Sequence, residues 1–236
     1  MNHLSNTDTV TVRRDGRIAV VIPRTGPRKR WGELLPPSLL NDSKITVFDD
    51  RADPNMSLDI ARHIATSCEY DVVFGHFSSR AALYARDLYS ERGLVSIFPL
   101  SSASVMTENR SARNSSSITV MASDLEQLNL MKSHILQDEK VLDSRNHRDP
   151  LILAGRDLDS LSLTRNTDVN QFYGRTIGVM GPSDVLLKYR ASIRSISSIG
   201  AKLIFSDDSW TYRDSWIDLL NPNQISFITS KPTPEI

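Results

Sequence analysis

The sequence predicts an α/β protein built on parallel sheets. Short, continuous runs of β-branched and other apolar residues recur along the chain, and such runs are typical of strands that are covered on both faces. Amphipathic stretches with apolar residues at three- and four-residue spacing separate many of these runs and indicate helices. Strands that alternate with helices pair in parallel and are joined by right-handed crossovers.

The first half of the chain contains four predicted strands and two predicted helices. The strands are Ile18–Ile22, Ile45–Phe48, Asp71–Phe74 and Leu94–Phe98. One helix runs from Ser57 to Cys68, and we expect Cys68 to be a core residue because it ends the apolar stripe. The other helix begins at Ser78 or Ser79, either of which can cap it, and ends at Gly93.

The second half repeats this α/β pattern after a polar loop over residues 106–117. Its predicted strands are Ile118–Met121, Leu151–Ala154, Thr176–Met180, Lys202–Phe205 and Ile225–Thr229. Its predicted helices are Asp124–Gln137, a helix capped by Ser183 and ended by Gly200, and Trp210–Leu220. We therefore divide the chain into a polar tail (residues 1–16), a first lobe (residues 17–121) and a second lobe (residues 122–236).

Composition narrows the possible functions. Lys and Arg together number 28, as do Asp and Glu, so the formal net charge is zero, which argues against a nucleic-acid binder. The single cysteine excludes an intramolecular disulfide and a multi-cysteine metal site. No apolar run approaches the ~20 residues that cross a bilayer, so we expect no membrane insertion. The N-terminus has no apolar signal-peptide core, which predicts a cytoplasmic location, or a periplasmic one if a leader has been removed.

The sequence contains none of the common catalytic motifs. The nucleophile elbow G-x-S-x-G, the P-loop and the zinc-binding H-E-x-x-H pattern do not occur, and the histidines are scattered without metal-ligand spacing. Thr25-Gly26-Pro27 lacks the later glycines of a dinucleotide fingerprint. Asp49 and Asp50 follow a strand, and a strand-end turn explains them better than paired catalytic carboxylates do. We therefore expect no enzymatic activity, no cofactor and no metal.

Two serine pairs and one basic run are the candidate functional residues. Ser78-Ser79 and Ser101-Ser102 follow the third and fourth predicted strands, where hydroxyl and backbone N–H groups suit a carboxylate. The alternative, that Ser78 or Ser79 only caps its helix, stays open. The basic run consists of Arg24, Arg28, Lys29 and Arg30, with Trp31 beside it. Either this run is a solvated loop, or one arginine or Trp31 reaches over the mouth of the crevice and contacts ligand.

A longer motif includes the serine pairs. From Val73 to Thr107 the chain reads G-H-x-S-S, a helix ending in G-L, and then P-L-S-S-A-S with a later Thr. Upstream, Ile18–Pro27 ends in T-G-P, and Asp49-Asp50 with Asp53-Pro54 gives D-D-x-x-D-P. These motifs resemble those of the type I periplasmic binding proteins, and in particular the substrate-binding proteins of branched-chain amino-acid and amide ABC transporters.

The resemblance implies two Rossmann-like lobes that close on a small ligand without performing chemistry. It implies that Ser79, Ser101 and Ser102 contact an amino acid, an amide or a small carboxylate, with Ser78 as their neighbour. The sequence departs from the family pattern in its second half, so we expect an incomplete second lobe. That departure leaves two other interpretations open: a cytoplasmic sensor that binds a protein partner or forms a homo-oligomer, and, as a distant third, a small α/β enzyme.

Overall fold

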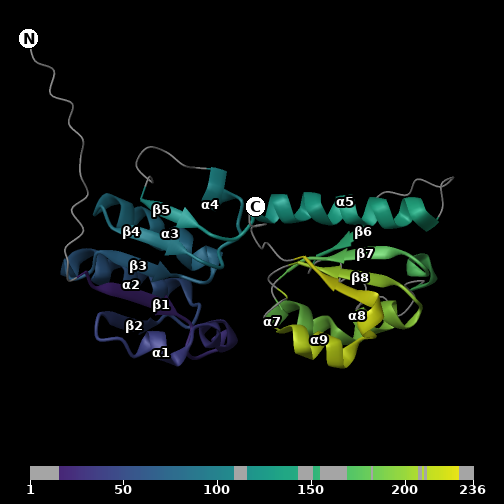
Figure 1. Cartoon of the computed structure of the whole chain (residues 1–236), viewed down its shortest axis with the longest axis horizontal. Coiled ribbons are helices and arrows are strands. Elements are labelled where there is room, and N and C mark those ends of the chain that lie inside the picture. The colour runs from purple at the N-terminus through teal and green to yellow at the C-terminus, as the bar shows by residue number, and fades with distance from the viewer. Residues whose placement is uncertain are drawn as a thin grey trace, which may run out of the picture. The chain divides into compact units, whose positions relative to one another are not determined.

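The structure is a computed structural model that describes residues 16–108, 116–142, 151–154, 169–181, 183–206, 209 and 212–228. Contacts divide the chain into two compact units, and both carry parallel strands and helices (Figure 1). The first unit comprises Met1–Ser101 and Met106–Val120, and the second comprises Ser102–Val105 and Met121–Ile236. All but the last residue of the expected N-terminal tail lies outside the described residues. None of the helices in the described part of the chain is long and apolar enough to cross a membrane.

The first unit is built on a five-stranded sheet in the order β2-β1-β3-β4-β5, with every pairing parallel. Its strands are β1 (Ile18–Ile22), β2 (Ile45–Asp49), β3 (Val72–Gly75), β4 (Val95–Phe98) and β5 (Ser117–Thr119). The interior strand β1 is buried from Ala19 to Ile22, as its unbroken apolar sequence predicted. Each of the five predicted strands is present within two residues of its expected bounds.

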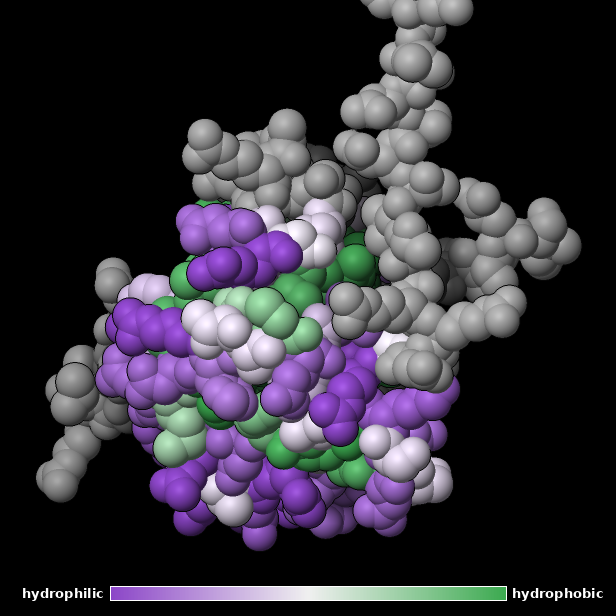
Figure 2. Space-filling view, turned by 90° about the vertical axis from the view of Figure 1, so that its left-hand side faces the viewer, coloured by the Kyte–Doolittle hydropathy of each residue, from purple (hydrophilic) through white to green (hydrophobic). Residues whose placement is uncertain are grey.

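Helices cover both faces of this sheet because β2 is added on one side of β1, whereas β3, β4 and β5 are added on the other side. The 3₁₀ helix η1 (Lys29–Leu34) and α1 (Pro37–Leu40) connect β1 to β2. The right-handed crossovers through α2 (Pro54–Ser67) and α3 (Ser79–Glu91) run the other way, which places them on the opposite face, where they pack together. The face shown in Figure 2 is mainly hydrophilic, with smaller hydrophobic areas between the polar residues.

The second unit has a four-stranded parallel sheet in the order β6-β7-β8-β9. Its strands are β6 (Leu151–Leu153), β7 (Thr176–Val179), β8 (Lys202–Phe205) and β9 (Ile225–Phe227). Its helical elements are α5 (Asp124–Leu142), η3 (Val169–Phe172), α7 (Ser183–Leu186), η4 (Leu187–Tyr189), α8 (Arg190–Ser198), α9 (Arg213–Leu219) and η6 (Pro222–Gln224). The short helix α4 (Val105–Glu108) begins in the second unit with Val105 and continues in the first.

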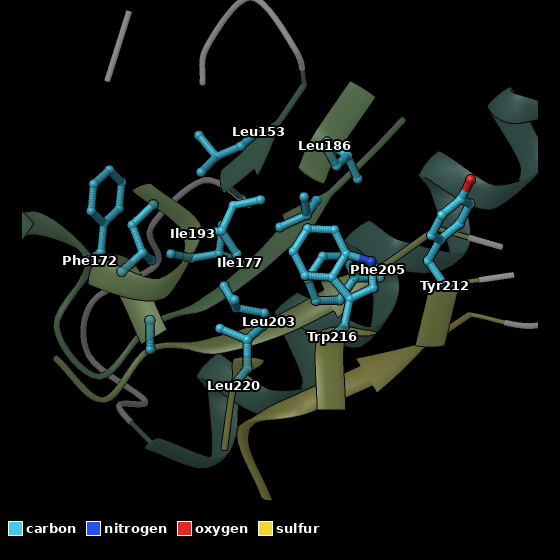
Figure 3. Close-up of a cluster of buried hydrophobic side chains, with 13 residues drawn as sticks. Leu153, Phe172, Ile177, Leu186, Ile193, Leu203, Phe205, Tyr212, Trp216 and Leu220 are labelled. Atoms are coloured by element: carbon cyan, nitrogen blue, oxygen red, sulfur yellow. The ribbon is translucent and has the colours of Figure 1, made fainter. Parts of the chain in front are cut away.

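Two apolar clusters hold this second sheet between its helices. On one face the Phe205 and Trp216 rings stack with their centroids 5.0 Å apart, within a cluster that includes Ile193 (Figure 3). On the other face Met131 of α5 packs with Ile204 in a second cluster. A side chain at Gly178 of β7 would collide with the Met131 sulfur, so a glycine there lets α5 approach the sheet closely.

Several predicted elements differ in detail. The single helix expected from Ser183 to Gly200 is divided by the 3₁₀ turn η4 between α7 and α8. The helix expected at Trp210–Leu220 begins only at Arg213, and both Trp210 and Thr229 lie outside the described residues. The stretch expected as a polar loop begins with the short helix α4.

Cys68 is the clearest error of the sequence interpretation. Its side chain is exposed rather than part of the core. The residue follows the last turn of α2 and has a φ of 55°, in the left-handed region that commonly ends a helix. A residue in that conformation no longer continues the helical spacing, so the apolar stripe of α2 ends before it.

Candidate functional site

Three loops of the first unit leave the carboxyl ends of neighbouring strands. β1 pairs with β3 and β3 with β4, all in parallel, so the loops that follow them begin at one edge of the sheet. This edge is where open α/β sheets bind ligands. The loops carry Arg28 after β1, Ser78 after β3 and Ser101 after β4.

The loop after β3 begins with a close contact between backbones. Gly75 has a φ of 133°, and a Cβ there would overlap the carbonyl group of Val21 in β1. The chain then reaches Ser78, the N-cap residue of α3, whose carbonyl accepts a hydrogen bond from the Ala82 N–H at 2.8 Å. The Ser78 hydroxyl makes no capping hydrogen bond to α3. Ser78 is only 5% exposed, and its Oγ accepts a hydrogen bond from Arg28 Nη1 at 3.5 Å.

The remaining predicted serines lie beside this loop or follow it in the chain. Ser79 is the first residue of α3 and is half-buried. Ser101 is buried, and its hydroxyl donates to the carbonyl oxygen of His76 at 3.2 Å, which joins the loops after β3 and β4. Ser102 is also buried but counts with the second unit, where its carbonyl accepts a hydrogen bond from the Asp124 N–H at 2.6 Å. The structure thus brings Ser78, Ser79 and Ser101 to one edge of the first unit.

A buried hydrogen-bond network beneath the loop fixes His76. Its Nδ1 lies 3.0 Å from Asp50 Oδ2 and its Nε2 lies 2.9 Å from the Tyr89 hydroxyl. Asp50 also accepts hydrogen bonds from the Ala52 N–H and the Ser57 hydroxyl. With Tyr89 donating to Nε2, the Nδ1–H of His76 donates to Asp50 and every partner is satisfied. Burial, and then the charge of Asp50, raise the pKa of Tyr89 well above its ordinary value.

This network contains a serine, a histidine and an aspartate, but it is not a catalytic triad. The Ser57 hydroxyl donates to Asp50 and to the Asp53 carbonyl rather than to His76. The histidine nitrogen that would act as the base is bonded to Tyr89, and both His76 and Asp50 are fully buried. The arrangement therefore holds the loop in place and offers no nucleophile.

Asp49 shapes the loop that carries the basic run. Its carboxylate accepts hydrogen bonds from the Arg24 N–H (2.9 Å), the Thr25 hydroxyl (2.6 Å) and the Arg51 N–H (3.0 Å). Burial by itself raises the pKa of Asp49, but these hydrogen bonds outweigh it and hold the pKa below its ordinary value. The expected strand-end turn at Asp49 and Asp50 is confirmed, although the pairing of Asp50 with His76 was not foreseen.

Within the basic run, Arg28 is the residue that reaches the serine loop. Arg24, Lys29 and Arg30 are exposed, whereas Arg28 is half-buried. Its guanidinium carbon lies 4.7 Å from the centre of the Trp31 ring. Trp31 itself is 5% exposed and packs with Val20, Ile22 and Phe77 in the core of the first unit. The solvated-loop interpretation therefore fits most of the run but not Arg28.

The sequence patterns did not predict that His76 pairs with Asp50, and they did not single out Arg28 among the arginines of the basic run. Asp50 and His76 are separated by 26 residues, so no spacing rule connects them. Among the residues that the structure describes, no group of three or more His, Cys, Asp or Glu side chains could hold a metal ion.

Comparison with known proteins gives matches among solved structures. No family model and no curated protein matches the sequence. The chain is similar to a solute-binding protein of an ABC transporter from Rhodopseudomonas palustris BisB5, in complex with 3,4-dihydroxybenzoic acid, with 16% identity and a TM-score of 0.56. It is also similar to the branched-chain amino acid transporter substrate-binding protein LivJ from Streptococcus pneumoniae, in complex with isoleucine, with 12% identity and a TM-score of 0.59. A third match is the leucine-binding protein LivK from Thermotoga maritima, with 14% identity and a TM-score of 0.56.

The matches cover most of this chain and less of the neighbours. The solute-binding protein aligns over 83% of this chain and 62% of its own length. LivJ aligns over 94% of this chain and 73% of its own length, and LivK over 82% and 64%. The chain therefore spans only part of the length of these neighbours. With its two parallel α/β units, the chain has the fold of the type I periplasmic binding proteins, as the motifs of its first half predicted.

Proposed function

We propose that this chain is a non-catalytic binding protein for a small molecule that carries a carboxylate, such as an amino acid or an aromatic acid. The observation that supports the proposal is the convergence of Ser78, Ser79 and Ser101 at the carboxyl edge of the first sheet. Hydroxyls beside a helix N-terminus suit a carboxylate. Two structural neighbours are complexes with 3,4-dihydroxybenzoic acid and isoleucine, which both contain this group.

In this proposal the contacts to ligand come from a few named residues. Ser79 and Ser101 donate hydrogen bonds to the carboxylate, with Ser78 beside them, and the Ser101 hydroxyl leaves the His76 carbonyl to do so. Trp31 contributes the rim of its ring to the apolar part of the ligand, although most of the ring is covered by the core and by Arg28. The proposed role is that of the substrate-binding component of a transporter. The two structural neighbours are named as transporter binding proteins of this kind, which supports the proposal.

A thermal-shift screen of the full chain tests the proposal. The probes are L-leucine, L-isoleucine, acetamide and 3,4-dihydroxybenzoate. A ligand present at 100 times its Kd stabilises the folded protein by about 2.7 kcal/mol, which a melting curve resolves readily. We expect at least one carboxylate to raise the Tm. No shift with any probe at millimolar concentration would contradict the proposal.

Serine variants then locate the site by isothermal titration. We expect Ser79→Ala and Ser101→Ala each to weaken binding of the carboxylate by about 1.5 kcal/mol or more, the usual value of a hydrogen bond to a charged group. Ser195→Ala is the matched control, since Ser195 is an exposed serine of α8 whose hydroxyl bonds only within its helix. Equal affinities in all three variants would place the ligand elsewhere.

A partner protein or a second copy of the chain is a further part of the proposal. One row of side chains crosses the first sheet from Val20 through Phe74 and Ile97 to Ile118. Val20 is 2% exposed and Ile118 is 50% exposed, so one end of this row is open. Parallel sheets usually have both faces covered. Light scattering after size-exclusion chromatography should therefore give more than the 26.5 kDa of one chain, or show a bound protein, and a clean monomer would argue against it.

A further inference from the structure

Arg28 is held in a defined position at the edge of the candidate site. It follows β1 in the chain, and its guanidinium lies 4.7 Å from the centre of the Trp31 ring. That ring is almost fully buried among Val20, Ile22 and Phe77, so it does not move freely beneath the cation. A cation over a partly desolvated aromatic face is attracted to it and keeps its place.

The guanidinium also reaches the serine loop. Arg28 Nη1 lies 3.5 Å from the Ser78 hydroxyl, which α3 does not use as a side-chain cap. Ser78 precedes the first residue of a 13-residue helix, whose N-terminal end carries partial positive charge. Guanidinium, hydroxyl and helix N-terminus therefore lie together, and each of the three favours a negatively charged group.

The two acidic residues at the end of β2, Asp49 and Asp50, accept hydrogen bonds from other donors. Asp49 binds the backbone of Arg24 and Arg51 and the hydroxyl of Thr25. Asp50 lies in the buried network with His76. The carboxylates of Asp49 and Asp50 are therefore engaged in these hydrogen bonds.

We propose that Arg28 determines the specificity of the site by pairing with a ligand carboxylate beside Ser78, so that the site selects organic anions over the matching neutral amides. The inference rests on the proposed function and names its ligand class more narrowly. The planar fork of N–H donors in a guanidinium matches the two oxygens of a carboxylate, whereas an amide offers one oxygen and no charge.

Matched acid and amide pairs provide the test. Isothermal titration of the full chain uses benzoate with benzamide, and 3,4-dihydroxybenzoate with its amide. Each pair is measured with the unmodified chain, Arg28→Gln, Arg28→Lys and Lys29→Gln. Lys29 is the control because it is an exposed neighbour whose replacement removes the same charge. The Tm of each free variant is measured to confirm that it folds.

The expected result is a change in selectivity rather than a general loss. A charge-assisted hydrogen bond corresponds to a factor of roughly 10 to 100 in affinity, so the unmodified chain should prefer the acid over the amide by about that factor. Arg28→Gln should lose most of this preference by weakening acid binding, with amide binding changed less than about threefold. Arg28→Lys should restore part of it, because lysine keeps the charge without the planar fork. Lys29→Gln should behave like the unmodified chain.

Two results would overturn the inference while the proposed function stands. One is an Arg28→Gln variant that keeps the preference for the acid. The other is an equal loss of acid and amide binding in that variant, which would mean that Arg28 supports the fold of the loop and not the choice of ligand. If the unmodified chain binds none of these compounds and no amino acid, the proposed function fails first and the inference fails with it.

Discussion

The side chain of Tyr89 shows how a single buried residue ties α3 to the loop that carries the candidate site. Its hydroxyl lies 2.9 Å from His76 Nε2, and the His76 carbonyl in turn accepts the hydrogen bond from Ser101. Because Tyr89 is fully buried, its ionised form would be poorly solvated and would also be repelled by Asp50. Folding therefore favours the protonated form of the Tyr89 hydroxyl.

This coupling gives a prediction for alkaline pH. The pKa of Tyr89 is raised in the folded protein above its value of about 10 in an unfolded chain, so the stabilising effect is complete below that pH and is lost as the pH rises above it. Tyr89→Phe should remove this part of the pH dependence, while costing about 1–3 kcal/mol at neutral pH because His76 loses a partner. Urea unfolding of both proteins between pH 7 and pH 11 measures the difference. If the free energy of unfolding falls equally in both proteins above pH 10, Tyr89 is not responsible for the loss of stability at alkaline pH.

Cys68 offers a second prediction at the scale of one residue. Its φ of 55° is a conformation that glycine adopts without strain. Cys68→Gly should leave stability unchanged or raise it by up to about 1 kcal/mol. Arg62→Gly is the matched comparison, since Arg62 is an exposed residue inside the same helix, and it should lower stability by about 1 kcal/mol. Chemical denaturation separates the two, and a loss in Cys68→Gly as large as in Arg62→Gly would contradict the left-handed cap.

Among the elements, α5 begins with a reciprocal cap that its sequence indicates. The N–H and hydroxyl of Ser123 donate to Glu126 Oε2 at 2.7 Å and 2.8 Å, and the Glu126 N–H donates back to Ser123 Oγ at 3.2 Å. This is the capping-box pattern of serine followed three residues later by glutamate. The hydrogen bonds from the backbone and then the side chain of Ser123 lower the pKa of Glu126.

The cap predicts two effects on stability. Ser123→Ala should destabilise the protein by about 1 kcal/mol, the usual cost of losing an N-cap. Because the pKa of Glu126 is lowered in the folded state, its contribution is present above the ordinary pKa of 4.5 and is lost as the pH falls below that value. Glu126→Gln should keep the hydrogen bonds and lose this acid dependence. Thermal unfolding between pH 3 and pH 7 checks both, and identical acid profiles for the two proteins would refute the assignment.

The strands could be read from the sequence because buried parallel strands are continuous apolar runs. Ile18–Ile22 and Lys202–Phe205 match the structure at both ends. The helix from Ser183 could not be placed as accurately, because its apolar spacing continues through the 3₁₀ turn at Leu187–Tyr189. Local patterns specify which face of an element is buried, but they do not specify where a regular helix is interrupted.

The candidate site was predicted only where its residues belong to a local motif. Ser78 and Ser101 were found because each follows a strand, and strand ends in a parallel sheet gather at one edge. The bond between Asp50 and His76 and the contact between Arg28 and Ser78 span 26 and 50 residues. Such contacts depend on how the strands are ordered in the sheet, which the sequence patterns did not specify.

At the scale of the whole molecule, each unit has a parallel sheet and an apolar core of its own. The side chains that support the proposed recognition of a carboxylate lie in the first unit, at the carboxyl ends of β1, β3 and β4. The central claim is therefore that this edge binds the ligand, and that a carboxylate placed there contacts the loops carrying Arg28, Ser78 and Ser101.

Nuclear magnetic resonance tests this claim most directly. The backbone amide signals of the ¹⁵N-labelled full chain are followed during titration with 3,4-dihydroxybenzoate, L-leucine and benzamide. We expect a carboxylate to shift the signals of Arg28, Ser78, Ser79 and Ser101 in a saturable way, while those of Ser195 and Ile196 in α8 stay unchanged. Saturable shifts confined to residues away from the carboxyl edge of the first sheet, or no shifts with any of these compounds, would contradict the account.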